Sequence, residues 1–251
     1  MQLNELPWPS VEGLPSDLPV VIPIAAVEQH GEHLPVATDS MLLAEIVRRV
    51  EESLGDQFLA APVQWLGNSH HHLDFPGTLS APPRAYLDMV QGLVQNFLDH
   101  GFRRVLLLNG HGGNDVPGKQ VLFELRQQQR RRKDLLLLFA TYWGLVDDLS
   151  QVDGLHQTQM GHACEWETSM MLQIAPELVG DYQAAEIVEP GNPFRPASRA
   201  WITKDRSRVG HLGWPNLASA EKGEALLEAF SSGVVNMIHR MRVWDGQSWD
   251  G

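Results

Sequence analysis

The segment RVLLLNGHGGN, residues 104–114, decides the fold class of this chain. Its first half is a short apolar run without alternation, a pattern typical of a strand that is covered on both faces in a parallel sheet. Its second half is a glycine-rich turn that presents one imidazole, that of His111. The segment therefore predicts a buried parallel strand over residues 104–109 that ends at a polar site.

Apolar runs of the same kind recur on both sides of this segment, at residues 20–27, 58–63 and 135–142. Stretches with helical spacing lie between them, at residues 39–50, with Asp39 as a candidate N-cap, at 85–100, and from Asn114 towards the basic residues 130–133. Strands that alternate with helices predict an α/β fold with a mostly parallel central sheet and helices on both faces. In such sheets the ligand lies beyond the carboxyl ends of the strands.

The rest of the chain, from residue 144 onwards, has a less regular pattern. We expect irregular structure at residues 144–158, helices at 162–174 and 219–242, and a long segment rich in Pro and Gly at 180–213. A long irregular segment in a compact domain is usually functional, so we interpret 180–213 as an active-site flap or a subunit contact. With 251 residues, the chain is predicted to form a single domain over 1–251.

Composition limits the class of partner and the compartment. The chain carries 19 Lys and Arg against 31 Asp and Glu, a net charge of −12, which disfavours nucleic acid and anionic membranes as partners. Its lone cysteine, Cys164, excludes an internal disulfide. The first residues have no secretory-signal pattern, and no apolar stretch is long enough for a membrane helix. We therefore predict a cytoplasmic protein.

The number and grouping of the histidines indicate a metal site. The chain has 11 histidines, and most gather at residues 30–33, 70–72, 111 and 156–162. Glu28 and His30 are two residues apart after a predicted strand, so in extended chain they share a face, and Asp39 can act as a carboxylate that bridges two ions. Carboxylates with imidazoles suit Zn, Mn or Fe. The alternatives are a solvated loop and an Asp39 that only caps its helix.

Two further segments offer donors, each with a structural alternative. His111 stands in a glycine-rich turn, which on its own is equally consistent with a plain βα connection or a phosphate cradle, although no nearby Lys completes a phosphate loop. In residues 162–169, HACEWETS, Glu165 follows His162 by three residues, so on a helix both project from one face while Glu167 points elsewhere. First-turn acids favoured by the helix dipole are the alternative there.

Taken together, these motifs resemble those of the creatininase (creatinine amidohydrolase) family. The resemblance rests on residues 28–31 (EQHG) with Leu34-Pro35 and Thr38-Asp39, 75–78 (FPGT), 109–114 (NGHGGN), 162–169, 213–215 (GWP) and 221–223 (EKG). It implies a three-layer α/β sandwich with two divalent metal ions per chain, Zn and/or Mn. One ion would be held by Glu28 and His111, the other by His30, and both by Asp39.

The chain departs from creatininase at two positions. Creatininase has a Glu where this chain has Gly113, and an apolar residue where it has Glu165. The resemblance therefore suggests that Glu165 supplies the missing ligand, that Glu167 supports a ligand or transfers a proton, and that His162 is the catalytic proton carrier. The same departure makes creatinine a weaker candidate substrate and favours the branches that cleave formamides or trim peptides.

The predicted function is a binuclear metal-dependent amidohydrolase that cleaves a small-molecule or non-standard C–N amide bond, in a lactam, a formamide or a short peptide, by attack of a metal-bridging water. The alternative is a non-catalytic member that binds a metal or a ligand.

The family also implies a homo-oligomer, a hexamer built from dimers. We predict that His72, Tyr142 and Trp143 contact the substrate; a surface position for His72 and core positions for the two aromatics are the alternatives.

Overall fold

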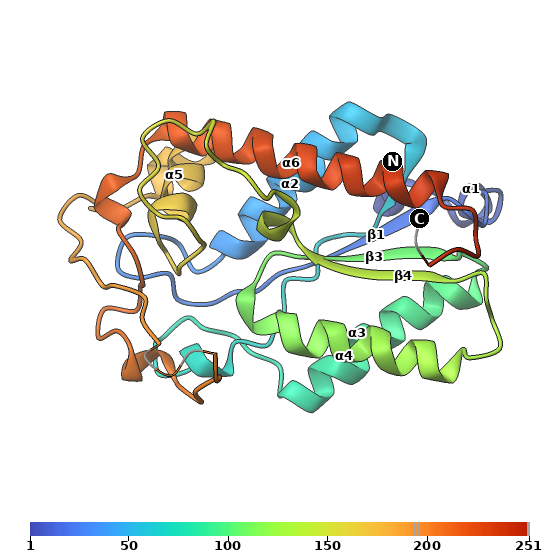
Figure 1. The fold of residues 1–251 in the computed structure, drawn as a ribbon, viewed down its shortest axis with the longest axis horizontal. Helices are drawn as coiled ribbons and strands as arrows, with labels where there is room; N and C mark the ends of the chain where they lie inside the picture. Colours follow the sequence, from blue (N-terminus) through green and yellow to red (C-terminus); the bar gives the residue numbers. More distant parts are fainter. Residues whose placement is uncertain (193, 195, 250–251) are drawn as a thin grey trace.

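The computed structural model describes residues 1–192, 194 and 196–249, and in this part of the chain four strands form one parallel sheet (Figure 1). The strand order is β2-β1-β3-β4, with bounds Pro19–Ile24 (β1), Leu59–Ala60 (β2), Arg104–Asn109 (β3) and Leu136–Thr141 (β4). β3 pairs along its whole length with both neighbours. β2 is shorter than predicted because the pairing with β1 slips after Ala61: the Ala61 N–H donates to the Val21 carbonyl oxygen and the Gln64 N–H to that of Pro23, so one extra residue interrupts the regular ladder.

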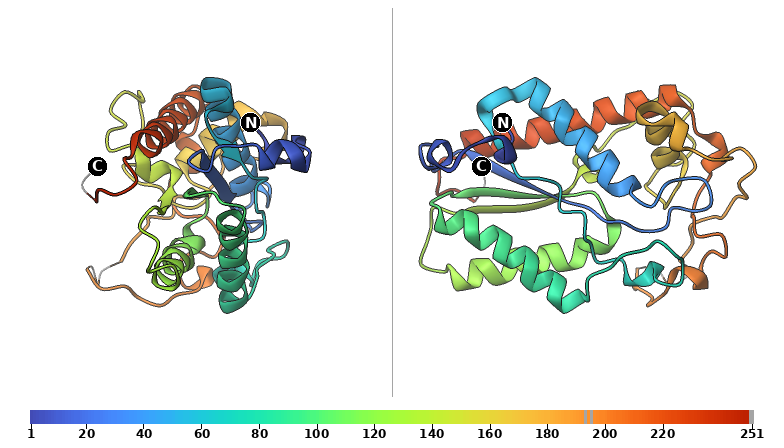
Figure 2. Two further views of the ribbon diagram at one scale, coloured as in Figure 1. Left: turned by 90° about the vertical axis from the view of Figure 1, so that its right-hand side faces the viewer. Right: turned by 180° about the vertical axis from the view of Figure 1, so that it is seen from behind.

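Helices cover both faces of the sheet, which makes three layers (Figures 1 and 2). Helices α3 (Pro83–Asp99) and α4 (Asp115–Gln128) lie on one face. Helices α2 (Thr38–Leu54), α5 (Glu165–Ile174) and α6 (Ala220–Val243) lie on the other, and a short α1 (Trp8–Glu12) precedes the first strand. The predicted α/β architecture is therefore confirmed.

The two layers of helices explain why the strands read as unbroken apolar runs. Val20, Ile22 and Ile24 belong to the core beneath α3 and α4, whereas Val21 and Ala25 belong to the core beneath α2, α5 and α6. All five side chains are buried. Successive residues of β1 point to opposite faces, and each face needs an apolar side chain.

Short 3₁₀ turns and irregular segments gather at the carboxyl ends of the strands. The turn η3 (His70–His72) lies next to η7 (Thr203–Asp205), which belongs to the long segment 180–213 (Figures 1 and 2). The other 3₁₀ turns are η1 (Leu3–Glu5), η2 (Gly55–Gln57), η4 (Gly112–Asn114), η5 (Tyr142–Leu145), η6 (Pro176–Leu178) and η8 (Pro215–Leu217). In the described residues, no helix is both long enough and apolar enough to cross a membrane.

Candidate metal centre

Five acidic and histidine side chains meet at the carboxyl edge of the sheet, namely Glu28, His30, Asp39, His111 and Glu167. Glu28 and His30 follow β1, His111 follows β3, and Asp39 and Glu167 lie in the first turns of α2 and α5. All five side chains are buried; the most exposed, Glu167, has 5% of its surface accessible. Asp39 does not cap α2 as expected, because the helix begins at Thr38 after Ala37 and the Asp39 carboxylate turns into the cluster.

Asp39 lies at the centre of this cluster. Its Oδ1 is 3.1 Å from His30 Nε2, and its Oδ2 is 2.9 Å from His111 Nδ1. Glu28 Oε1 lies 3.3 Å from His111 Nδ1. On the opposite side, Glu167 Oε1 lies 3.6 Å from His30 Nε2. The two oxygens of Asp39 thus face two separate imidazoles, each of which has a further carboxylate beside it.

The spacing of these donor atoms fits divalent cations. Ligands that surround a tetrahedral ion at about 2.1 Å stand about 3.4 Å from one another, and the four separations above lie between 2.9 and 3.6 Å. Glu28 Oε2 is buried and forms no hydrogen bond with any described residue. A buried carboxylate oxygen without a partner is costly unless a cation compensates it.

The electrostatics of the cluster favour positive charge on both sides of Asp39. Burial lowers the pKa of His111, but the carboxylates of Glu28 and Asp39 outweigh it and raise that pKa to about 10. The pKa of His30 is also raised, because Asp39 and Glu167 outweigh the effect of burial. The carboxylates therefore create a negative electrostatic potential at His30 and at His111. The same potential would stabilise a metal ion on each side of Asp39.

His162 faces the cluster with one ring nitrogen free. Its Nε2 donates to the Gln29 carbonyl oxygen at 2.8 Å, and its Nδ1 lies 3.6 Å from Glu28 Oε1. Burial, together with the neighbouring His30, lowers the pKa of His162 to about 3. The imidazole is therefore neutral near pH 7, and its Nδ1 lone pair points towards the cluster.

His72 is held in the opposite tautomer. Its Nδ1 lies 2.7 Å from Gln29 Nε2 and 2.8 Å from Thr203 Oγ1, and both groups can donate to it. The ring proton is then on Nε2, which lies 3.4 Å from Glu28 Oε1. The structure therefore places His72 inside the site, as expected. It also adds Gln29 and Thr203, which the sequence pattern did not single out.

The prediction that Glu165 faces the cluster is wrong. Its carboxylate accepts hydrogen bonds from the backbone N–H groups of His156 and Gln157 and forms an ion pair with Lys222 Nζ at 2.7 Å. Glu165 is fully buried in this separate network. Glu167 occupies the position that we expected for Glu165.

The reason lies in the start of α5. An i, i+3 relation between His162 and Glu165 requires a helix that begins at His162, but α5 begins at Glu165. His162 instead pairs as an isolated β-bridge with Leu212, and Ala163 has a left-handed φ of 45°. Residues 162 and 165 therefore do not share a helical face, and the turn directs Glu165 away from the site.

We expect Glu165→Ala to destabilise the fold and to leave metal binding intact. The substitution removes the acceptor of two backbone N–H groups, that of Gln157 buried, and leaves Lys222, which is only partly exposed, without its ion-pair partner. Losing one member of a buried pair lowers the free energy of unfolding by about 3 kcal/mol. Chemical denaturation of the metal-free protein measures this change, with the exposed Glu177→Ala as the matched control. A Glu165→Ala protein that unfolds like the parent and loses an ion would contradict this assignment.

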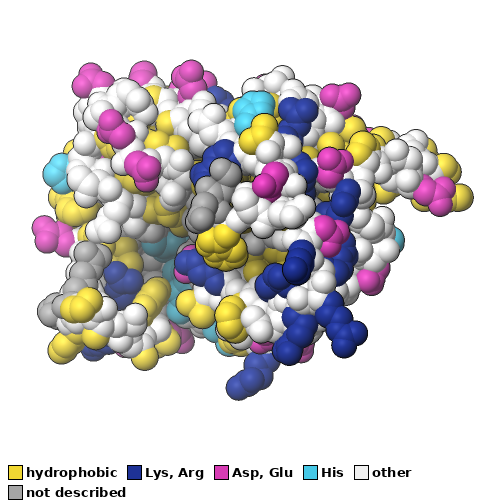
Figure 3. Space-filling model, turned by 45° about the vertical axis from the view of Figure 1, so that its right-hand side comes forward, with side chains coloured by type: hydrophobic (Ala, Val, Ile, Leu, Met, Phe, Trp, Pro, Cys, Tyr) yellow, Lys and Arg dark blue, Asp and Glu magenta, His cyan; other side chains and the backbone are white. Residues whose placement is uncertain are grey.

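A cavity of about 990 Å³ opens above the cluster. Figure 3 shows this hollow, with histidine side chains in its depth and Lys or Arg side chains at its rim. Trp143 lines the cavity, and its contact with a substrate stays a prediction. Tyr142 does not: it is buried in the core, where its ring packs against Trp143 and Phe230, so the core alternative holds for this residue.

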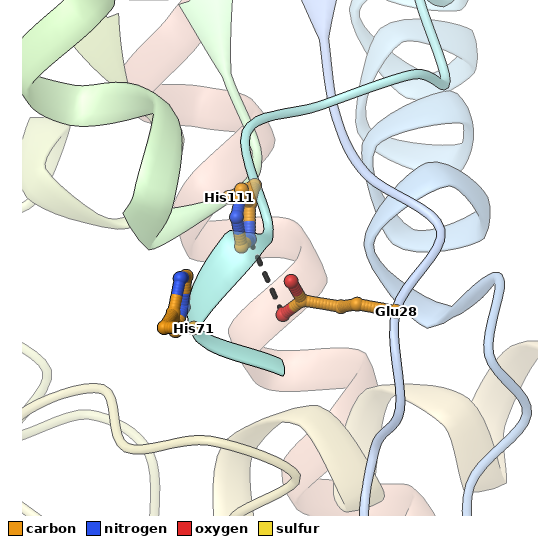
Figure 4. A group of neighbouring side chains, drawn as sticks. All are labelled: Glu28, His71 and His111. Carbon is orange, nitrogen blue, oxygen red and sulfur yellow. Dashed lines mark ion pairs between the residues drawn. The ribbon is translucent and has the colours of Figure 1, made fainter. Parts of the chain in front are cut away.

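His71 is a residue of the site that our sequence reasoning missed. The signal was present, because the run His70-His71-His72 was recognised as a histidine cluster, but only His72 was given a role. Figure 4 shows the Glu28 carboxylate directed towards His71 and His111, which both lie on the same side of it. The donor atoms of these three residues all lie within 4.8 Å of one another.

Comparison with known proteins adds independent evidence. The family model for creatinine amidohydrolase matches residues 4–238. The chain is 30% identical over 254 residues to the creatinine amidohydrolase of Pseudomonas putida, covering 94% of this chain and 95% of that protein. It is 29% identical over 227 residues to the mycofactocin precursor peptide peptidase of Mycolicibacterium smegmatis, covering 88% and 84% of the two chains.

Solved structures agree with the sequence comparison. A creatininase described as its Mn form superposes with a TM-score of 0.77 at 28% identity, covering 95% of this chain and 97% of that one. A creatininase mutant described as the Zn-Zn type gives a TM-score of 0.79 at 29% identity, with 95% and 97% coverage. The named relatives are hydrolases. Because the family model matches nearly its whole length, the chain belongs to the creatininase (creatinine amidohydrolase) family.

Proposed function

We propose that this chain is a binuclear metal-dependent amidohydrolase that cleaves the C–N bond of a small amide or a short peptide. The observation that carries the proposal is the arrangement around Asp39, whose two oxygens face His30 and His111 in a buried cluster. A carboxylate shared between two donor sets is the arrangement expected at a two-metal hydrolytic site. The cluster lies at the bottom of a cavity, which gives a substrate access to it.

The donor sets suggest which residues hold each ion. Glu28 and His111 would hold one, His30 and Glu167 the other, and Asp39 both. Carboxylates combined with imidazoles suit Zn, Mn or Fe. The Zn-Zn and Mn descriptions of structurally similar creatininases support Zn or Mn in this chain. We assign Glu167 as a ligand, in place of Glu165.

When bound, such cations polarise a carbonyl group and lower the pKa of a water molecule. The chain contributes the proton chemistry beside them. His162 is neutral and its Nδ1 faces the cluster, so it can accept a proton there and deliver it to a leaving nitrogen. The Gln29 carbonyl oxygen fixes the His162 ring by accepting from Nε2. The Nε2–H of His72 is positioned to donate to an oxygen next to Glu28.

The cavity wall favours a substrate that carries an anionic group. Arg206 lines the cavity, is half-buried, and its guanidinium lies 4.7 Å from the centre of the Trp201 ring. Burial lowers its pKa, and no carboxylate of the described residues counters that effect. A half-buried guanidinium without a carboxylate partner is suited to bind a carboxylate of the substrate. A short peptide with a free C-terminus is one amide of this class.

We expect Arg206→Ala to raise KM for amides that carry a carboxylate by about 10- to 100-fold, the range for one charge-assisted hydrogen bond. The effect on kcat should be small, because the guanidinium lies in the wall and makes no contact with the metal cluster. The measurement is steady-state kinetics on matched amides with and without the carboxylate, using the exposed neighbour Arg208→Ala as control. An equal rise in KM for both amides would remove this assignment.

The proposed function as a whole is tested by a metal-reconstituted activity screen. Creatinine, formamides and short peptides are incubated with protein loaded with Zn or Mn, and metal content is measured on the same sample. We expect metal-dependent turnover of one amide class, with creatinine disfavoured. Bound metal without turnover in any class would favour a non-catalytic role, and protein that takes up no metal would contradict the proposal.

A further inference from the structure

We propose that His71 is a further ligand of the metal ion held by Glu28 and His111. This inference rests on the proposed function, because it requires that an ion binds there. His71 lies in η3, in the loop that crosses the carboxyl edge of the sheet, and so approaches the cluster from a different element than either of its partners (Figure 4).

The geometry of the three side chains carries the inference. One donor atom from each of Glu28, His71 and His111 lies within 4.8 Å of the other two. The His71 and His111 rings are nearly parallel, with an interplanar angle of 11° and centroids 5.7 Å apart. Two imidazoles and one carboxylate thus surround a common point at the floor of the cavity, on the His111 side of Asp39.

The hydrogen bonding of the histidine run separates His71 from its neighbours. His70 Nδ1 lies 2.6 Å from Ser80 Oγ, and His72 Nδ1 is bonded to Gln29 and Thr203. Within the described part of the chain, no hydrogen bond engages the His71 ring. The ring is instead positioned by packing, with its centroid 4.2 Å from that of His72 and 4.9 Å from that of Trp201 in a T-shaped arrangement. Both of its nitrogens therefore remain available to a cation.

Gly113 provides the space that this arrangement needs. A Cβ at this position would lie 2.4 Å from His111 Nε2, 2.9 Å from His71 Cε1 and 2.2 Å from the Asn68 carbonyl oxygen. These distances are shorter than any van der Waals contact, so a larger residue would displace one or both imidazoles. A glycine here is compatible with two imidazoles side by side at this end of the cluster.

The additional ligand makes the two metal sites chemically different. With His71, the first site has two imidazoles and two carboxylates, from His71, His111, Glu28 and Asp39. The second has one imidazole and two carboxylates, from His30, Asp39 and Glu167. Imidazole-rich sites favour Zn, and carboxylate-rich sites tolerate Mn. We therefore expect the first site to bind Zn more tightly than the second.

The test is a competition titration of metal-free protein with Zn against a chromophoric chelator. The parent is expected to bind two ions, and His71→Ala is expected to lose affinity about 100-fold or more at one site and to keep the other. Substitution of residues that only support ligands already costs 10- to 100-fold. His70→Ala, an exposed neighbour bonded to Ser80, is the matched control and should bind both ions like the parent.

Two further measurements keep the outcomes distinct. The thermal unfolding of the metal-free variants establishes that His71→Ala is folded, and the absorption spectrum of the Co(II)-loaded protein reports the loss of a nitrogen ligand at one site. Unchanged affinities and an unchanged spectrum in folded His71→Ala would overturn the inference, and a rise in KM alone would identify His71 as a substrate contact. A parent that binds no metal would contradict the proposed function itself.

Discussion

Asp39→Ala is expected to abolish binding of both metal ions and to lower turnover by at least about 10³-fold. Each Asp39 oxygen faces a different imidazole, at 3.1 Å for His30 and 2.9 Å for His111, so the substitution removes a donor from both sites at once. The loss of turnover follows because bound cations supply several kcal/mol of transition-state stabilisation. Elemental analysis after reconstitution with Zn or Mn measures the metal content.

The metal content of Glu28→Ala should be compared with that of Asp39→Ala. Glu28 Oε1 lies 3.3 Å from His111 Nδ1, whereas its carboxylate comes only within 4.8 Å of a His30 nitrogen, so this variant should lose mainly the ion on the His111 side. The exposed Asp56→Ala should retain both ions, which controls for the removal of a negative charge alone. Equal metal loss in Asp39→Ala and Glu28→Ala would remove the bridging role assigned to Asp39.

His162→Ala is expected to retain both ions and to lower turnover by roughly 10²- to 10⁴-fold, the range for a positioned general acid or base. Two contacts of the ring give it this role. Nε2 is engaged by the Gln29 carbonyl oxygen, and Nδ1 faces Glu28 at 3.6 Å with its lone pair free. The imidazole thus stands beside the cluster at a distance suited to proton transfer through a water molecule or a substrate atom.

Metal analysis decides between the two roles open to His162. Its ring also lies within reach of His30 and Glu167, so a role as ligand would show as loss of one ion in His162→Ala. His239→Ala, on the exposed side of α6, is the matched control and should change neither metal content nor rate. An emptied metal site, or a rate equal to that of the parent on its best substrate, would each contradict the proposed proton transfer.

The strands were predictable because their sequence signal is local. The run over residues 104–109 is bounded by Arg104 and by Asn109-Gly110, and β3 has those bounds. The run over 58–63 is longer than β2, because a pattern of apolar residues does not show the one-residue slip in pairing between Ala61 and Gln64. The positions of Glu28, His30, Asp39 and His111 followed from the same strands, since side chains after parallel strands meet at one edge.

The assignment of ligands from α5 failed because it depended on backbone dihedrals. An i, i+3 argument from His162 to Glu165 holds only on a helix, and the left-handed Ala163 followed by an extended Cys164 cannot be foreseen from residue types. Glu165 instead forms an ion pair with Lys222, which is 57 positions away in the chain. Similarly, Thr203 reaches His72 from a segment with no regular pattern.

The most direct test of a two-metal centre at Asp39 is anomalous diffraction from crystals of the reconstituted protein, recorded at the absorption edge of the metal. We predict two peaks, one on each side of Asp39, with an Asp39 oxygen about 2.0–2.2 Å from each as in Zn–carboxylate bonds, and with Glu167 next to the peak on the His30 side. A single peak, no peak, or an ion bound to Glu165 in place of Glu167 would contradict the account.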